Sequence, residues 1–225
     1  MVKHEGHQGM MMTTQQSKRI NTREKYNRIA RWYDLFELMI ELLAFAHWRK
    51  HLFKLIKGKE VLEVGVGTGK NLKYYPIDAK VTAIDFSEKM LKYAKQRAAK
   101  IGLDANLKNM DVQDLQFESN SFPNVIATFV FCSVPDPVIG LKEIKRVSIP
   151  NGRLVLLEHV RPKNPWLGKL FDWFNPIAVK RTGVNINRDT AENIRKAGFR
   201  IELEKNLLGN VFKLFVARPR RLTKI

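Results

Sequence analysis

The stretch VLEVGVGTGKN, residues 61–71, decides the fold. It opens with an apolar run rich in valine, typical of a buried strand, and continues into Gly65, Gly67 and Gly69. Glycine has no Cβ atom, so the backbone can turn tightly there and approach a ligand. We expect a helix to follow the turn directly, with its N-terminal N–H groups facing a carboxylate or phosphate. The stretch therefore predicts a strand, a ligand-binding turn and a helix.

An acidic residue sharpens this interpretation. Glu63 lies two positions before the first glycine, where a buried strand usually has an aliphatic side chain, and a buried carboxylate needs a cationic partner. The glycines follow a GxGxG spacing, whereas dinucleotide-binding turns follow GxGxxG. Glycine-rich turns also occur where they only connect a strand to a helix, so the turn alone does not establish a function.

A second carboxylate ends the next apolar run, VTAID at 81–85. In a doubly wound sheet the ends of the first two strands lie side by side, so Asp85 can accept hydrogen bonds from both ribose hydroxyls of a nucleoside. Asp85 could instead cap the helix that begins with SEKML. Ser87 is the better cap, which favours ribose binding.

Beyond residue 60, short apolar runs alternate with amphipathic segments, which is the pattern of a parallel sheet with helices on both faces. The last third begins with a looser stretch, 161–188. It is followed by a short helix near 190–197, capped by Asp189 and stopped by Gly198, and by two closing strands, RIELEKNLL and NVFKLFVAR. We predict an α/β fold with a Rossmann-like, doubly wound, seven-stranded, mostly parallel sheet.

The region before the sheet has the apolar spacing of one long helix or two stacked helices over 22–57, ended by Gly58. Its apolar faces need cover from protein, a partner or a lipid interface. We therefore divide the chain into a flexible basic N-terminus, a helical lid or membrane-facing helix, one α/β domain and a basic tail, at 1–20, 21–58, 59–217 and 218–225.

The composition is that of a soluble globular chain, because 44% of its 225 residues are hydrophobic and 28% are charged. The single cysteine, Cys132, closes no intramolecular disulfide and fits a reducing compartment. No apolar run suits a secretory signal or a membrane span. Most of the net charge of +18 lies in residues 1–60 and 161–225, which would attract an anionic lipid surface or a nucleic acid. A solvated lysine-rich surface without such a partner is the alternative.

These motifs resemble the class I S-adenosylmethionine-dependent methyltransferases. EVGVGTG and AID are similar to the first and second motifs of that family, MDVQDLQF at 110–117 to its GDAExLPF segment, and PNGRLVLLEH at 150–159 to its PGG turn and fifth strand. The resemblance implies S-adenosylmethionine as cofactor, with Glu63 orienting its amino group, Asp85 binding the ribose and Asp111 accepting from the adenine. The cofactor-binding residues that it implies are Glu63, Gly65, Gly67, Gly69, Asp85, Phe86, Met90, Asp111, Val112 and Phe129.

Segments outside the cofactor motifs indicate which members of that family the chain resembles most. YNRIARWYD at 26–34 is similar to the N-terminal signature of bacterial phospholipid N-methyltransferases and ubiquinone/menaquinone C-methyltransferases, and implies that Tyr33 closes over the cofactor rather than fills the core. FVFCSVPDP at 129–137, with EHV and GVNINRDT downstream, resembles membrane-associated thiol methyltransferases. The phospholipid enzymes also have a histidine after the fifth strand, which His159 matches. All of these relatives imply an apolar acceptor reached from a membrane surface.

The acceptor site is expected beyond the strand ends, near Cys132, His159 and the 161–188 stretch. We interpret Cys132 as a small buried hydrophobe, and His159 either as a general base or as a hydrogen-bonded residue that supports the strand end. The 161–188 stretch is aromatic and basic, which fits an acceptor or membrane site, and equally a core-packing helix with a snorkelling basic face. Its candidate substrate or membrane residues are Trp166, Lys169, Trp173, Lys180 and Arg181. No cluster has the spacing of metal ligands.

We therefore expect methyl transfer to a membrane lipid by a cytoplasmic protein that is peripherally bound to an anionic membrane. A phospholipid headgroup amine is the first acceptor, and a quinone ring carbon or a small thiol is the alternative. A different class, an RNA-binding methyltransferase, would explain the basic flanks through phosphate contacts. A cofactor-binding fold without catalysis is the remaining alternative. The sequence leaves the oligomeric state open.

Overall fold

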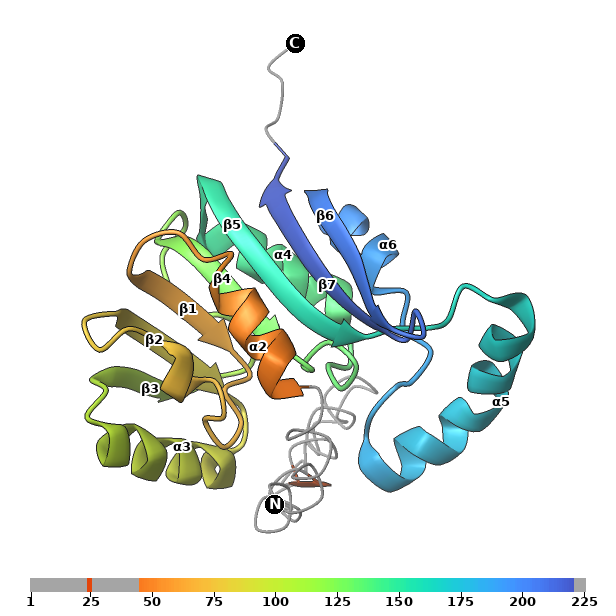
Figure 1. Cartoon of the computed structure of the whole chain (residues 1–225), viewed down its shortest axis with the longest axis horizontal. Helices are drawn as coiled ribbons and strands as arrows, with labels where there is room; N and C mark the ends of the chain where they lie inside the picture. The colour runs from red at the N-terminus through yellow and green to blue at the C-terminus, as the bar shows by residue number, and fades with distance from the viewer. Residues whose placement is uncertain (1–23, 26–44, 221–225) are drawn as a thin grey trace, which may run out of the picture.

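One seven-stranded sheet forms the centre of the protein in a computed structural model that describes residues 24–25 and 45–220. The strand order is β3-β2-β1-β4-β5-β7-β6, and β7 runs antiparallel to both of its neighbours (Figure 1). The remaining neighbours pair in parallel, which confirms the predicted α/β, doubly wound, mostly parallel sheet. The strands are β1 Glu60–Val64, β2 Lys80–Asp85, β3 Ala105–Asn109, β4 Phe122–Thr128, β5 Ser148–His159, β6 Phe199–Leu208 and β7 Phe212–Pro219.

Helices cover both faces of this sheet. The helices are α2 Ala46–Phe53, the 3-10 helix η2 Leu72–Tyr74, α3 Glu88–Ile101, α4 Pro137–Val147, α5 Pro165–Thr182 and α6 Thr190–Lys196. One core joins the sheet to α2, η2 and α3, and the other joins it to α4 and α6. In Figure 1, α2 lies in front of the sheet, α4 and α6 lie behind it, and α5 stands out beyond its edge. Among the described residues, no helix is long and apolar enough to cross a membrane.

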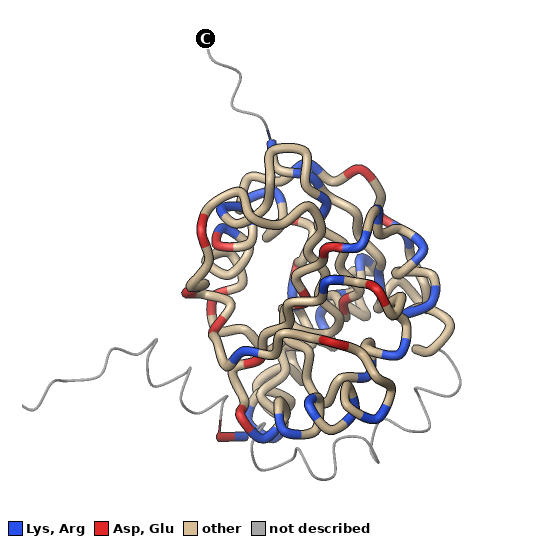
Figure 2. Tube along the Cα trace, turned by 90° about the vertical axis from the view of Figure 1, so that its left-hand side faces the viewer, with Lys and Arg blue, Asp and Glu red and all other residues tan. Residues whose placement is uncertain are grey.

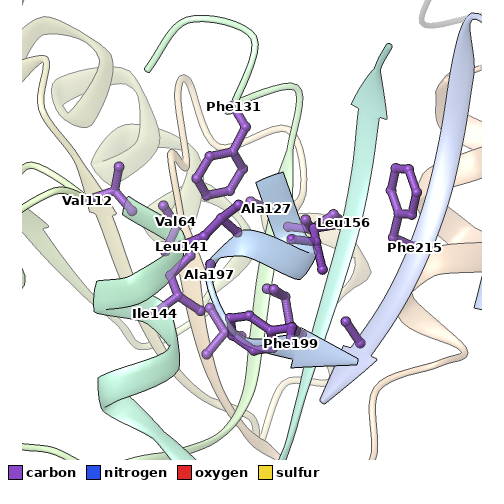
Figure 3. Close-up of a cluster of buried hydrophobic side chains, with 14 of the residues drawn as sticks. Val64, Val112, Ala127, Phe131, Leu141, Ile144, Leu156, Ala197, Phe199 and Phe215 are labelled. Atoms are coloured by element: carbon purple, nitrogen blue, oxygen red, sulfur yellow. The ribbon is translucent and has the colours of Figure 1, made fainter. Parts of the chain in front are cut away.

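The two cores are supplied by alternate positions of each central strand. In β1, Leu62 and Val64 enter the core beneath α4 and α6, while Val61 enters the core beneath α3. This period of two arises because successive side chains of a strand point to opposite faces. Figure 3 shows the core beneath α4 and α6, where Leu141 of α4 and Leu156 of β5 lie among other buried side chains.

The turn after β1 differs from its prediction, because no α-helix follows the glycines. The chain forms only the three-residue helix η2 before it becomes extended at Tyr75, with ψ 141°. Pro76 explains this, since the residue before a proline is disfavoured in the helical region. Gly69 also has a φ of +84°, which a helix cannot contain. The expected anion-binding helix N-terminus is therefore wrong for this turn.

The predicted N-terminal helix is described only in part. The described helix α2 ends at Phe53, so Gly58 does not end it as expected. The remainder of that predicted helical region and the basic N-terminus lie outside the described residues, as does the tail from 221 onward.

The stretch predicted to be loose contains the 18-residue helix α5. Asn164 caps it by accepting from the N–H groups of Trp166 and Leu167 at 3.0 and 3.1 Å, and Pro165 occupies the first turn, where no N–H partner is required. Further along, the predicted cap and stop of α6 are confirmed. Asp189 Oδ1 accepts from the N–H of Glu192 at 3.0 Å, and Gly198 has a φ of +85°.

Candidate active site

A cavity opens at the C-terminal ends of β1, β2 and β4, beside the point between β1 and β4 where the path of the chain across the sheet reverses. The empty space between its walls, including its open mouth, is about 750 Å³. The lining residues are Val64, Gly65, Gly67, Ile84, Asp85, Phe86, Met90, Met110, Asp111, Val112, Thr128, Phe129, Val130, Ser133, Val134 and Pro135.

The glycines of the turn have different roles. A Cβ atom on Gly65 would lie 2.4 Å from Val130 Cγ2, and one on Gly69 would lie 2.7 Å from Leu72 Cδ1, so both positions require glycine for close packing. A Cβ on Gly67 would meet nothing within 4 Å. Gly67 therefore presents bare backbone to the cavity, whereas Gly69 packs behind the wall and does not line it.

Asp85 is the last residue of β2 and one wall of the cavity. Its Oδ2 accepts from the N–H of Gly67 and its Oδ1 from the N–H of Ser87, both at 2.9 Å. Ser87, not Asp85, caps α3, because its Oγ accepts from the N–H of Met90. Burial raises the pKa of Asp85 to about 6 although both N–H donors oppose the shift. Each carboxylate oxygen can accept a further hydrogen bond, so the geometry suits a ligand with neighbouring hydroxyls.

Glu63 lies behind the wall in a buried polar network. Its Oε1 accepts from Asn71 Nδ2 at 2.7 Å and its Oε2 from the Tyr75 hydroxyl at 3.0 Å. Arg49 of α2 donates to Asn71 Oδ1 at 2.6 Å and to Thr128 Oγ1 at 3.0 Å. Burial raises the pKa of Glu63 to about 7, while the charge of Arg49 acts to lower it. Arg49 is thus a cation near Glu63, and it connects α2 to the end of β4.

The far side of the cavity is formed after β3 and β4. Asp111 Oδ1 accepts from the N–H of Gln113 at 2.8 Å, beside the apolar Val112. Phe129 has a φ of +59°, a region that costs energy for a non-glycine residue and is found preferentially at functional sites. Its N–H donates to the carbonyl of Leu157 at 2.8 Å, and its ring centroid lies 4.5 Å from that of Phe45. These contacts hold the strained residue in place.

The structure brings nearly all of the predicted cofactor residues together in this one cavity. Only Glu63 and Gly69 among them lie behind its lining, while Tyr33 lies outside the described residues. The individual roles of these residues in cofactor binding stay predictions. Within the described ranges, no group of three or more His, Cys, Asp or Glu side chains could hold a metal ion.

His159 ends β5 but does not line the cavity. Its ring stacks on Phe171 of α5 with centroids 5.8 Å apart and meets Phe212 edge-on at 5.2 Å. Burial lowers the pKa of His159 to about 4, so the imidazole is neutral at physiological pH. Its buried Nδ1 has no hydrogen-bond partner in the part of the chain that the structure describes, which does not agree with a satisfied strand-end histidine.

The neighbouring Glu158 was missed by the sequence analysis. Its Oε1 accepts from the N–H groups of Val130 and Phe131 at 2.9 and 3.1 Å, and thereby holds the loop that lines the cavity after β4. Burial raises the pKa of Glu158 to about 8. The signal was present, because an acid in the apolar run LVLLEH is as unexpected as Glu63 is in VLEVG.

Other residues that form the site are harder to recognise from the sequence. Arg49, Asn71 and Tyr75 form the network around Glu63, yet nothing in their spacing marks them as its partners. Cys132 is buried, as predicted, and its Sγ lies 3.5 Å from the carbonyl oxygen of Phe129.

The candidate acceptor residues of α5 lie apart from the cavity. Trp166 and Trp173 are 82% and 69% exposed, which rules out the alternative of a core-packing helix. Lys169, Lys180 and Arg181 are also exposed. Through Phe171 the helix still contacts His159 at the end of β5, so α5 adjoins the strand-end edge of the protein.

A family described as Methyltransferase domain matches residues 62–156. A phosphatidylethanolamine N-methyltransferase of Cereibacter sphaeroides is 39% identical over 112 residues, which are 48% of this chain and 55% of that protein, so the chain spans about half its length. A ubiquinone/menaquinone biosynthesis C-methyltransferase of Bdellovibrio bacteriovorus is 30% identical over 183 residues, 78% of each chain.

A solved structure from Thermotoga maritima, described as an S-adenosylmethionine-dependent methyltransferase and a possible histamine N-methyltransferase, has a similar fold. Its TM-score is 0.67 at 20% identity, over 88% of this chain and 99% of that one. At this identity the likeness shows the fold alone, since one fold hosts many functions.

Proposed function

Because this chain belongs to the class I S-adenosylmethionine-dependent methyltransferases, we propose that it transfers a methyl group from S-adenosylmethionine to a membrane lipid, and first to a phospholipid headgroup amine. One observation carries the proposal: the cavity lies at the C-terminal ends of the strands, and the exposed aromatic helix α5, which follows β5 in the chain (Figure 1), contacts the C-terminal end of β5 through Phe171 and His159. The names of the two relatives reported above also refer to lipids, to phosphatidylethanolamine in one case and to ubiquinone/menaquinone biosynthesis in the other.

The described residues fit the cofactor of the family. Gly67 offers bare backbone at the cavity, and Asp85 keeps acceptor capacity beside it. We assign the ribose hydroxyls to Asp85 and the adenine amino group to Asp111. Glu63 lies behind the wall, where desolvation makes a nearby cation favourable, and we assign to it the amino group at the methionine end.

The cofactor supplies an electrophilic methyl group on a positively charged sulfur. The protein's main task is then to align donor and acceptor, which is worth about 7–11 kcal/mol in favourable cases. Phe129 of the cavity wall forms a cluster of rings with Phe45 and Phe212, with centroid distances of 4.5 to 6.0 Å, and Phe212 also contacts His159. We assign to this apolar cluster the exclusion of water from the region where an acceptor would approach.

An amine acceptor attacks only as the free base. His159, with its pKa lowered to about 4, is neutral at physiological pH but takes up a proton poorly, because proton transfer is most efficient when the pKa lies near the working pH. We therefore assign to His159 the orientation of the acceptor through a hydrogen bond to its neutral imidazole. The proton leaves to water.

The acceptor is tested by incubating the protein with S-adenosylmethionine labelled in the methyl group. Vesicles with phosphatidylethanolamine, vesicles with a demethylated quinone, a small aliphatic thiol and total RNA serve as parallel acceptors. We expect label in the phospholipid. Label confined to the thiol or the RNA would contradict a lipid acceptor, and label confined to the quinone would replace the amine by a ring carbon.

The quinone is the second candidate because the longer of the two sequence matches, over 183 residues, is to a quinone enzyme. The distribution of charge gives RNA less support. Figure 2 shows Lys and Arg scattered along the described trace and interleaved with Asp and Glu, whereas a nucleic-acid site usually gathers basic residues on one face.

A further inference from the structure

The side of α5 that faces solvent is apolar and aromatic. Trp166, Leu170, Trp173 and Ile177 are between 47% and 82% exposed. Their spacing of three and four residues places them along one face of the helix, as a continuous stripe. A contiguous exposed apolar surface of this kind marks a site of interaction with a partner or a membrane.

Basic side chains flank the stripe at both ends. Near the start of α5, Lys169 Nζ lies 5.8 Å from the ring centroid of Trp166. Lys180 and Arg181 occupy the last turn. The one acidic residue of the helix, Asp172, is ion-paired with Arg161 at 2.7 Å and so does not oppose an anionic surface. Tryptophan beside lysine and arginine is typical of helices that lie in a membrane interface.

The opposite side attaches α5 to the body of the protein. A Cβ on Gly168 would lie 2.8 Å from the Arg161 guanidinium, so the helix approaches that side chain closely. Phe171 stacks on His159, and Asn175 Oδ1 accepts from the N–H of Ile186 at 2.8 Å. These contacts fix the orientation of the helix, and they leave the stripe directed outward.

We infer that the stripe, together with Lys169, Lys180 and Arg181, docks on the surface of an anionic lipid bilayer. The inference rests on the proposed lipid acceptor and names the element that reaches the lipid. An anionic bilayer fits the stripe better than other partners because its charge is complementary: the whole chain carries a net charge of +18, and cations border the stripe. Docking would place the end of β5, with His159, next to the headgroups.

The test is co-sedimentation of the full chain with phosphatidylcholine vesicles, with and without phosphatidylglycerol. The variant Trp166→Ala/Trp173→Ala removes the two most exposed aromatic side chains of the stripe. The matched control, Ile77→Ala/Tyr93→Ala, removes two other exposed apolar side chains, which are 70% and 36% exposed. They belong to the turn before β2 and to α3, on the opposite side of the molecule from α5 in Figure 1. The charge variant is Lys180→Glu/Arg181→Glu.

We expect the parent and the control to bind anionic vesicles at least about tenfold more tightly than neutral ones, and less tightly as salt increases. The tryptophan variant should lose about tenfold or more in affinity for anionic vesicles, and the charge variant should lose its preference for them. Equal binding by the parent and the tryptophan variant would overturn the inference. So would a parent dimer that the tryptophan variant dissociates without any vesicle binding, since the stripe would then contact a second copy.

Two further measurements separate this inference from the proposed function. Cofactor titration should give the same affinity for the parent and the tryptophan variant, because no residue of α5 lines the cavity, and this equality confirms that the variant is folded. Methyl transfer to lipids in detergent micelles removes the need for docking. No transfer in micelles, with tryptophan-dependent vesicle binding intact, would contradict the lipid acceptor and leave the docking surface standing.

Discussion

Three buried carboxyl groups lie around the cavity at the ends of the parallel strands. Burial raises the pKa of Asp85 to about 6, of Glu63 to about 7 and of Glu158 to about 8. In each case hydrogen-bond donors oppose the shift without cancelling it. Such groups cost stability at neutral pH, and perturbed carboxyl groups in a cavity are typical of functional sites.

Glu158 gives a prediction about stability. Its folded-state pKa of about 8 lies above its ordinary value of 4.5, so its contribution to stability is complete below about pH 4.5 and is lost as the pH rises towards 8. Glu158→Gln removes the titration and keeps one acceptor for the N–H groups of Val130 and Phe131. Urea unfolding should therefore show the variant gaining more than about 1 kcal/mol relative to the parent between pH 5 and pH 8. A difference that is constant over this range would place the titration elsewhere.

His159 gives a prediction about turnover. If the neutral imidazole orients the acceptor, His159→Asn should keep most of kcat, since an amide also accepts a hydrogen bond, whereas His159→Ala should lower kcat by about tenfold or more at unchanged cofactor affinity. Because the pKa of His159 is lowered to about 4, the parent's kcat/KM profile should have no histidine limb between pH 5 and 8. An Asn variant as slow as the Ala variant, together with a limb near pH 6.5 in the parent, would restore the role of general base.

At the scale of elements, the turn after β1 and the loop after β4 pack closely against each other. Gly65 has a φ of +67°, and the space that a Cβ would need there is filled by Val130. Glu158 holds that same loop through the N–H of Val130. The turn and the loop both line one cavity, so we expect a change in one of them to alter the packing of the other.

This fit predicts a partial rescue. Gly65→Ala should destabilise the protein by about 1–3 kcal/mol, from the clash with Val130 and from the positive φ. Adding Val130→Ala removes the clash and leaves the backbone strain, so the double variant should recover part of the loss. Thermal unfolding of the parent, both single variants and the double variant measures the coupling. Additive effects of the two substitutions would show that the two residues do not contact each other in this way.

The elements differ in how far they could be predicted. The central strands β1, β4, β5 and β7 followed from their apolar runs, because burial on both faces leaves a continuous signal. The stretch that contains α5 was predicted to be loose, with a core-packing helix as the alternative, because Gly168 and Pro176 interrupt its helical pattern, although the spacing of Trp166, Leu170 and Trp173 has the helical period. The prediction of an α-helix after the glycines was wrong for the opposite reason. Its apolar spacing was suggestive, but Pro76 forces the chain to extend.

At the scale of the whole molecule, the site is formed where the path of the chain reverses between β1 and β4. The sequence could predict Asp85 and Gly67 as neighbours, since the carboxyl ends of parallel strands meet at one edge. It could not predict Arg49 beside Asn71, or Glu158 beneath the loop after β4, because those contacts depend on how α2 and β5 lie across the sheet.

The most direct test of this account is calorimetric titration of S-adenosylmethionine into the parent, Asp85→Asn and the matched control Asp104→Asn. Asp104 is an exposed acid that does not line the cavity. Losing hydrogen bonds to a charged acceptor is worth about 1–3 kcal/mol, so Asp85→Asn should raise Kd by about 5- to 150-fold while the control stays at the parent value. An unchanged Kd in a folded Asp85 variant would contradict the assignment of the cavity as the cofactor site.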